Sequence, residues 1–204
     1  MPKIVDPEAR RREVTEIAAD LIVRGGRSAL TVRNVAEAAG CSSTVVSHYF
    51  EDMLDLLYET YSFAVDRSAR RIRRVLDRDP TDLAGLVEAV LPLDRERTDD
   101  WRIWFAFWSE ALSSPRFAAE QRQRARTQLE RLERCLDQLA AEGALTPGVD
   151  VADAAHRLAA LVPGIAAEAI FAPQQWPPAR QQRVLRSELT LLGLVDPDRS
   201  SARA

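Results

Sequence analysis

The side chains best suited to binding chemistry in this sequence are small hydrogen-bonding groups near residue 45. Ser43, Thr44, Ser47 and His48 follow one another closely along the chain. Hydroxyl and imidazole groups both donate and accept hydrogen bonds, so they suit the base edges and phosphates of a nucleic acid. These residues therefore predict a polar binding surface, provided that one element presents them together.

The surrounding segment has the pattern of two short helices joined by a glycine. Thr31 suits the N-cap of a helix that runs through Ala39, and Gly40 supplies a left-handed turn at its end. Ser42 or Ser43 then caps a helix through Tyr49. In a helix-turn-helix the second helix enters the major groove of DNA, although a plain helical hairpin fits the spacing equally well. Close crossing of the helices is allowed by small or apolar residues, namely Val35, Ala36, Ala39, Cys41, Val46 and Tyr49.

The rest of the chain also shows helical periodicity, which predicts an all-α protein of about nine helices. Apolar residues from Val14 to Ile22 form one face of a first helix that Gly25 and Gly26 end. A proline and a glycine at 163 and 164 predict a kink in the eighth helix. The helices beyond the first three are expected at 52–77, 82–93, 99–112, 115–142, 150–172 and 178–194.

These elements suggest three regions. Residues 1–50 hold three helices and are termed the head, and residues 51–195 form a larger helical body that begins with a long helix at 51–79. Residues 196–204 are polar and are expected to be a disordered tail.

Charge and composition narrow the class of protein. Of 28 basic and 31 acidic residues, the first 50 positions hold seven and five, so a head of +2 precedes a body of −5. This polarity suits a head that faces DNA. The two cysteines, Cys41 and Cys135, lie far apart in no metal-ligand spacing. With no leader-like start and no membrane-spanning run, we expect a cytoplasmic protein without disulfides.

Two stretches of the head resemble the TetR family of repressors. They are Thr31-Val-Arg-Asn-Val-Ala-Glu-Ala-Ala-Gly40 and Val45-Val-Ser-His-Tyr-Phe50. The second stretch is most similar to the branch that includes the choline-responsive repressor of glycine betaine synthesis, as are Leu91-Pro-Leu-Asp94 and the segment 101–112. The resemblance implies that residues 1–50 form a DNA-binding head, that 51–79 form the connecting helix, and that residues 51–195 bind an effector and dimerise through the last two helices. Such a dimer would leave a palindromic operator when a small-molecule effector binds.

Carried onto this chain, the resemblance implies roles for residues of the second and third helices. Thr31 and Arg33 would meet the phosphate backbone. The recognition helix would use Ser42, Ser43, Thr44, Ser47, His48 and Tyr49. Tyr49 and Phe50 have an equally good structural interpretation, because they could fill the space between the head and the fourth helix.

One position departs from the family pattern. Members commonly carry a lysine, a phosphate contact, three residues after the phenylalanine, whereas this chain has Met53 beside Glu51 and Asp52. The missing cation should weaken DNA binding and lower its salt dependence by about one phosphate contact. The arginine run 10–12 could compensate.

An aromatic stripe marks the candidate effector site. Trp101, Trp104, Phe105 and Trp108 share one helix face by their spacing, and Leu112 continues it. Indole faces with a nearby carboxylate, Glu110 or Glu168, suit a quaternary ammonium ion by cation–π attraction. We place His156 and Glu168 in the same pocket. The alternative is that the stripe is ordinary core.

Dimer contacts are expected from the eighth and ninth helices, although the same residues could serve the core of the monomer. Two copies are needed because one recognition helix reads only a few base pairs. The residues are Ala155, Leu158, Ala159, Val162, Leu185, Leu189 and Leu192.

Two other classes of function remain as alternatives. An all-α enzyme is disfavoured because the sequence has no Glu-x-x-His pair, no phosphate-binding glycine loop, no Cys-x-x-Cys and no nucleophile motif. We accordingly expect no metal, no cofactor and no catalytic residue. A helical module that binds protein partners is the other alternative, and salt-dependent, sequence-selective DNA binding would separate the regulator from both.

Overall fold

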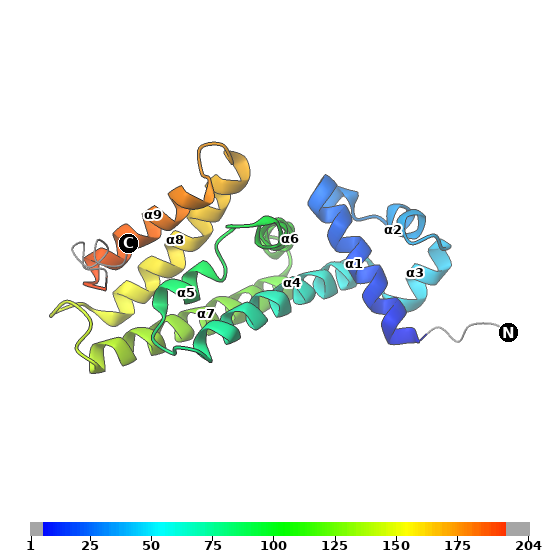
Figure 1. Cartoon of the computed structure of the whole chain (residues 1–204). Helices are drawn as coiled ribbons and strands as arrows, with labels where there is room; N and C mark the ends of the chain where they lie inside the picture. The colour runs from blue at the N-terminus through cyan, green and yellow to red at the C-terminus, as the bar shows by residue number, and fades with distance from the viewer. Residues whose placement is uncertain (1–5, 195–204) are drawn as a thin grey trace. The chain divides into compact units, whose positions relative to one another are not determined.

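The computed structural model describes residues 6–194, and its secondary structure over this range is entirely helical (Figure 1). The all-α prediction is therefore confirmed. In chain order the elements are α1 Pro7–Gly25, the short 3-10 turn η1 Arg27–Ala29, α2 Val32–Ala38, α3 Ser43–Tyr49, α4 Met53–Leu76, α5 Leu83–Glu88, α6 Arg95–Ala111, α7 Pro115–Ala141, α8 Val151–Phe171 and α9 Pro178–Leu191.

The chain divides into two compact units. The first runs to Arg67 and adds Asp99–Ala119, and the second comprises Ser68–Thr98 and the residues from Glu120 onward. The predicted boundary at residue 50 stays a prediction. The tail predicted at 196–204 lies outside the described residues.

In the first unit, local signals in the sequence set both ends of α1 and the start of α4. The Asp6 carboxylate accepts a hydrogen bond from the Glu8 N–H (3.0 Å) and caps α1, with Pro7 at the first helical position. Gly26, with φ of +68°, ends this helix in a conformation that favours glycine. The Asp52 carboxylate accepts a hydrogen bond from the Asp55 N–H (2.7 Å) at the start of α4.

Aromatic side chains form much of the core of this unit. Tyr61 of α4 stacks on Phe107 of α6 with ring centroids 3.8 Å apart, and Phe107 meets Phe117 edge to face at 4.8 Å. Phe107 is wholly buried. Because these rings lie on α4, α6 and the start of α7, they fix α6 against α4.

In the second unit, α8 and α9 lie side by side, and α5 also contacts α9 (Figure 1). Leu158 and Ile165 of α8 and Leu185 and Leu189 of α9 are buried. Helix α8 continues through Pro163, so the bend predicted there remains a prediction. Among residues 6–194, α8 is also the one helix whose length and apolarity would let it cross a membrane. Its buried residues recur from Ala154 to Ala169, as in the core helix of a water-soluble protein.

The segment between α5 and α6 differs from the prediction. A helix was expected at 82–93, but α5 ends at Glu88, and α6 begins at Arg95 rather than at 99. The reason is Asp94, whose carboxylate accepts a hydrogen bond from the Arg97 N–H (2.9 Å) and so caps α6.

Candidate DNA-binding surface and effector site

Helices α2 and α3 pack against each other as a helix-turn-helix. Gly40 has φ of +59° and its N–H bonds the Glu37 carbonyl, while the Cys41 N–H bonds the Ala36 carbonyl (3.0 Å). These bonds close the end of α2 in the manner of a glycine C-cap. Val35, Ala36 and Val46 are buried between the helices. The turn therefore has the conformation that the sequence predicts.

The opposite side of α3 is a row of free polar groups. Ser42, Ser43, Thr44, Ser47 and His48 are all exposed. Within the described part of the chain, none of the four hydroxyl groups makes a side-chain hydrogen bond to another protein group. Hydroxyls without an internal partner are available to base edges or phosphates.

The two aromatic residues at the end of α3 differ in their burial. Phe50 is 3% exposed and belongs to the core, as its structural interpretation holds. Tyr49 is half-buried, and its ring meets the His48 ring edge to face at 5.2 Å. Tyr49 thus retains a partly accessible ring beside the exposed imidazole.

The start of α2 presents two more polar residues on the same head. Thr31 caps this helix, because its Oγ1 accepts a hydrogen bond from the Asn34 N–H (3.2 Å). Its hydroxyl proton remains free to donate. Arg33 is exposed. Both residues are therefore accessible to a phosphate backbone.

Arg11 links α3 to α4, a role that the arginine run in the sequence did not indicate. Its guanidinium donates to the Tyr49 carbonyl (2.6 Å) and to the Glu59 carboxylate (2.8 Å) and lies 4.7 Å from the Phe50 ring centroid. Arg10 donates to the Ala39 carbonyl (3.1 Å) in the turn. Arg12, which is exposed, is the member of the run left toward solvent.

The aromatic stripe of α6 forms a cluster around one indole. Trp101 is buried. The centroid of its ring lies 4.7 Å from that of Trp104, 5.4 Å from that of Phe105 and 5.8 Å from that of Trp108. Phe105 and Trp108 are half-buried, whereas Leu112, expected to continue the stripe, is 91% exposed. The inner half of the stripe is thus core-like, and its outer half is partly accessible.

Polar groups accompany this cluster. The buried indole N–H of Trp104 has no acceptor among the described residues. One turn earlier than Trp104, the wholly buried Asp100 forms an ion pair with Arg67 of α4. Glu110, one of two carboxylates considered for a cationic ligand, instead pairs with Arg27 at 2.9 Å. An unpaired indole N–H beside aromatic faces suits a ligand that carries a hydrogen-bond acceptor.

His156 and Glu168 lie on α8 in the second unit, and both are exposed. The His156 Nδ1 is 2.8 Å from the Ala152 carbonyl oxygen of its own helix. Their place in the pocket stays a prediction. Among residues 6–194, no three His, Cys, Asp or Glu side chains gather closely enough to hold a metal ion.

Two sequence profiles cover most of the chain. The tetR family of bacterial regulatory proteins matches residues 14–60, and the C-terminal domain of BetI-type transcriptional repressors matches residues 80–193. The transcriptional regulator BetI of Paraburkholderia xenovorans is 30% identical over 169 residues, 81% of this chain and 84% of that protein. The chain belongs to the TetR family.

Solved structures support the same fold for this TetR-family chain. A transcriptional regulator from Rhodococcus sp. Rha1 is 26% identical, with a TM-score of 0.79 over 92% of this chain and 99% of that one. One from Saccharomonospora viridis, crystallised with choline, is 24% identical, with a TM-score of 0.77 over 91% and 97%. The chain is therefore a DNA-binding transcriptional regulator of a repressor family, with a ligand-binding C-terminal domain of the BetI type. Its family consists of regulators rather than enzymes.

Homodimers are typical of the TetR family, and the residues predicted for the dimer contact are mostly buried inside this chain. Ala155, Leu158 and Leu192 have no exposed surface, and Val162, Leu185 and Leu189 are also buried. Ala159 is half-buried. These side chains pack within the second unit, as the alternative interpretation allowed, and their part in a dimer stays a prediction.

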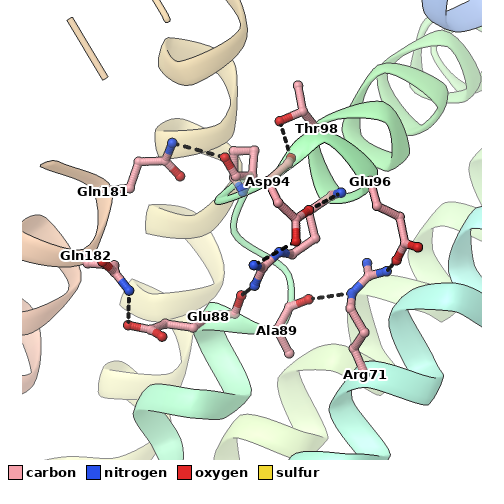
Figure 2. Close-up of polar contacts among 10 residues, drawn as sticks. Arg71, Glu88, Ala89, Asp94, Glu96, Thr98, Gln181 and Gln182 are labelled. Atoms are coloured by element: carbon pink, nitrogen blue, oxygen red, sulfur yellow. Dashed lines mark hydrogen bonds and ion pairs between the residues drawn. The ribbon is translucent and has the colours of Figure 1, made fainter. Parts of the chain in front are cut away.

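A polar network around the segment that links α5 to α6 was not foreseen (Figure 2). Arg71 of α4 donates to the Ala89 carbonyl (3.1 Å), and the Arg97 guanidinium bridges the Glu88 carbonyl (2.7 Å) and the Asp94 carboxylate (2.9 Å). The buried Gln181 of α9 donates to the Pro92 carbonyl (3.2 Å). The network ties this loop to α4 and α9, and the only sequence signal for it was the Asp94-x-x-Arg97 spacing.

Proposed function

We propose that this TetR-family regulator binds a palindromic operator as a cytoplasmic homodimer and is released from it by a cationic small molecule. The observation that carries the proposal is the exposed row of free hydroxyls on α3, opposite the buried face that holds the helix in place. Beside this row, Thr31 and Arg33 contact the phosphate backbone of the DNA.

The DNA-binding part is tested by selecting bound duplexes from a randomised pool, followed by footprinting. A palindrome is expected. Thr44→Ala or Ser47→Ala should then cost about 1 to 3 kcal/mol at particular bases if they read sequence. Ser28→Ala, on the same head but outside the helix-turn-helix, is the matched control. An equal loss of affinity on all duplexes would mean that Thr44 and Ser47 contact the phosphate backbone of the DNA and do not read its bases.

The dimer is proposed to form over the outward faces of α8 and α9. Phe171 and Leu191 are large apolar residues with exposed fractions of 82% and 67%. A Cβ atom at Gly164 would meet no other atom of the chain within 4 Å, so Gly164→Arg should leave the fold intact but block close approach of a partner helix. Sedimentation should show a dimer for the parent protein and for the exposed control Ala140→Arg, and a monomer for Gly164→Arg. A dimeric Gly164→Arg variant would move the interface elsewhere.

The effector is proposed to be a quaternary ammonium compound held against the half-buried rings of Phe105 and Trp108. The choline bound by the similarly folded regulator of Saccharomonospora viridis supports this chemistry. Isothermal titration with choline, betaine aldehyde and a polyamine tests it. Binding should weaken at least tenfold in Trp108→Leu, and no heat with any of the three compounds would reject the cationic ligand.

A further inference from the structure

Four arginines of the second unit gather where α7 lies near the second half of α4. Three of them recur on α7 at steps of seven and three residues, which places them within about 80° of one another around the helix. The fourth comes from α4. We term this set the α7 arginine cluster, and its members are Arg73, Arg124, Arg131 and Arg134.

Arg131 lies at the centre of the cluster, close enough to the other three guanidinium groups to be affected by their charge. Burial and, after it, the positive charges of Arg134, Arg124 and Arg73 lower the pKa of its side chain. The guanidinium still carries its charge at neutral pH, because arginine is not deprotonated in proteins. Positive charge therefore accumulates around a side chain that water reaches only in part.

This positive charge has few partners inside the protein. Arg131 is half-buried, and among residues 6–194 it forms neither an ion pair nor a hydrogen bond. Arg73 and Arg134 are exposed and are likewise unpaired over the same range. Arg124 pairs with Glu120 at 2.7 Å. Because a partly buried charge without a partner loses hydration and gains nothing in return, such charges are usually paired.

The carboxylates nearest in sequence do not supply the missing partner. Glu130 lies one turn before Arg134, and Asp77 lies one turn after Arg73. Both are exposed, and neither forms an ion pair within the part of the chain that the structure describes. Around α7, Glu130 is also about 100° away from Arg131. The counter-charge is therefore expected from outside the chain.

The dimensions of the cluster suit a compact ligand that carries several negative charges. Along the axis of α7, Arg131 is about 4.5 Å from Arg134 and about 10.5 Å from Arg124, so these long side chains can converge on one small group. Guanidinium groups bind phosphate oxygens through paired, parallel hydrogen bonds. A diphosphate offers such oxygens on both of its phosphorus atoms, whereas a single carboxylate would leave most of the cluster without a partner.

We propose that the α7 arginine cluster binds a diphosphate group, supplied either by inorganic pyrophosphate or by a nucleotide. The site is distinct from the polar face of α3 and from the aromatic cluster of α6, because those residues belong to the first unit and the arginines belong to the second. A bound diphosphate would offset the repulsion between the guanidinium groups and so stabilise the second unit.

Isothermal titration of pyrophosphate into the full-length protein, at constant ionic strength and without divalent metal ions, tests the proposal. Arg131→Met removes the half-buried charge but keeps an apolar side chain, and it should weaken binding at least tenfold because charge-assisted hydrogen bonds are lost. The matched control is Arg126→Met, at an exposed position about 140° away on the same helix. It removes the same charge and should change the affinity less than threefold.

Two further ligands define the chemistry that the site recognises. ADP that binds at least as tightly as pyrophosphate would identify a nucleotide as the source of the diphosphate, and weaker binding of ADP would identify the inorganic ion. Sulfate should bind at least tenfold more weakly than pyrophosphate. Sulfate binding of equal strength would overturn the assignment to a diphosphate.

Other results would overturn the site itself. They are the absence of saturable heat with both pyrophosphate and ADP, and an equal loss of affinity in Arg131→Met and Arg126→Met. Arg134→Met, at an exposed position, repeats the test if Arg131→Met is poorly folded, and it should weaken binding at least threefold. Arg131→Met should also keep the parent affinity for a selected DNA duplex within threefold. A tenfold loss there would assign the cluster to DNA instead.

Discussion

Arg11→Met should destabilise the protein more than any other single change in the arginine run 10–12. The guanidinium of Arg11 is shared among the Tyr49 carbonyl (2.6 Å), the Glu59 carboxylate (2.8 Å) and the Phe50 ring (4.7 Å). Methionine keeps the aliphatic contacts of the side chain but removes these three interactions, together with the longer ion pair to the Asp55 carboxylate (3.8 Å). The expected loss therefore measures how firmly the recognition helix is fixed to α4.

The magnitude follows from the exposure of the partners. A hydrogen bond from a charged donor to a carbonyl contributes about 1.5 kcal/mol. The contact with Phe50 adds about 0.5 kcal/mol. The pair with Glu59 adds about 0.5 kcal/mol at most, because both side chains are more than a third exposed. The free energy of unfolding should thus fall by about 2 kcal/mol.

Urea unfolding followed by circular dichroism, at one fixed protein concentration, measures this loss. Arg12→Met is the matched control, because Arg12 is adjacent and exposed, and its effect should stay within about 0.5 kcal/mol. If the two variants unfold at the same urea concentration, Arg11 does not hold the head in the manner described.

Three further changes have definite expected results. Met53→Lys should tighten duplex binding and steepen the slope of log affinity against log salt by about 0.9, as measured by anisotropy from low to high salt. In the native protein a thiol reagent should modify the half-buried Cys41 but not Cys135, because burial raises the pKa of the Cys135 thiol to about 11. The absorbance of the released reagent should show that Cys135 reacts only after the protein is unfolded. Asp100→Asn should lower the free energy of unfolding by about 3 kcal/mol in urea, because it leaves Arg67 without its buried carboxylate partner; a loss below about 1 kcal/mol would contradict this.

The head is the part of the fold that the sequence predicts best. Its signals are local: Thr31 caps α2, Gly40 makes the turn, and Val35 and Val46 fall on the face that becomes buried. Each of these features depends on residues within a few positions, so periodicity and capping rules suffice to find them. Exposure of the polar face of α3 follows once the apolar face is fixed.

Longer-range partners could not be predicted in this way. The spacing of Leu158, Leu185 and Leu189 indicates an apolar helix face, but it does not say whether a neighbouring helix or a second copy covers that face. Glu110 and Arg27 are 83 positions apart, so their pairing depends on how α6 packs against the head. The start of α6 was missed because the Asp94 cap was hidden among other charged residues.

The reading face of α3 contains hydroxyls and an imidazole but neither lysine nor arginine, and this has a consequence for the search along the genome. Attraction to random DNA is almost wholly electrostatic, so a surface of this kind holds unrelated sequence weakly. Such a protein slides along DNA only briefly and spends more time free in solution between binding events. On the proposed palindromic operator, its residence time would depend on the fit of two heads to one site, and a modest loss of that fit would be enough to release the protein.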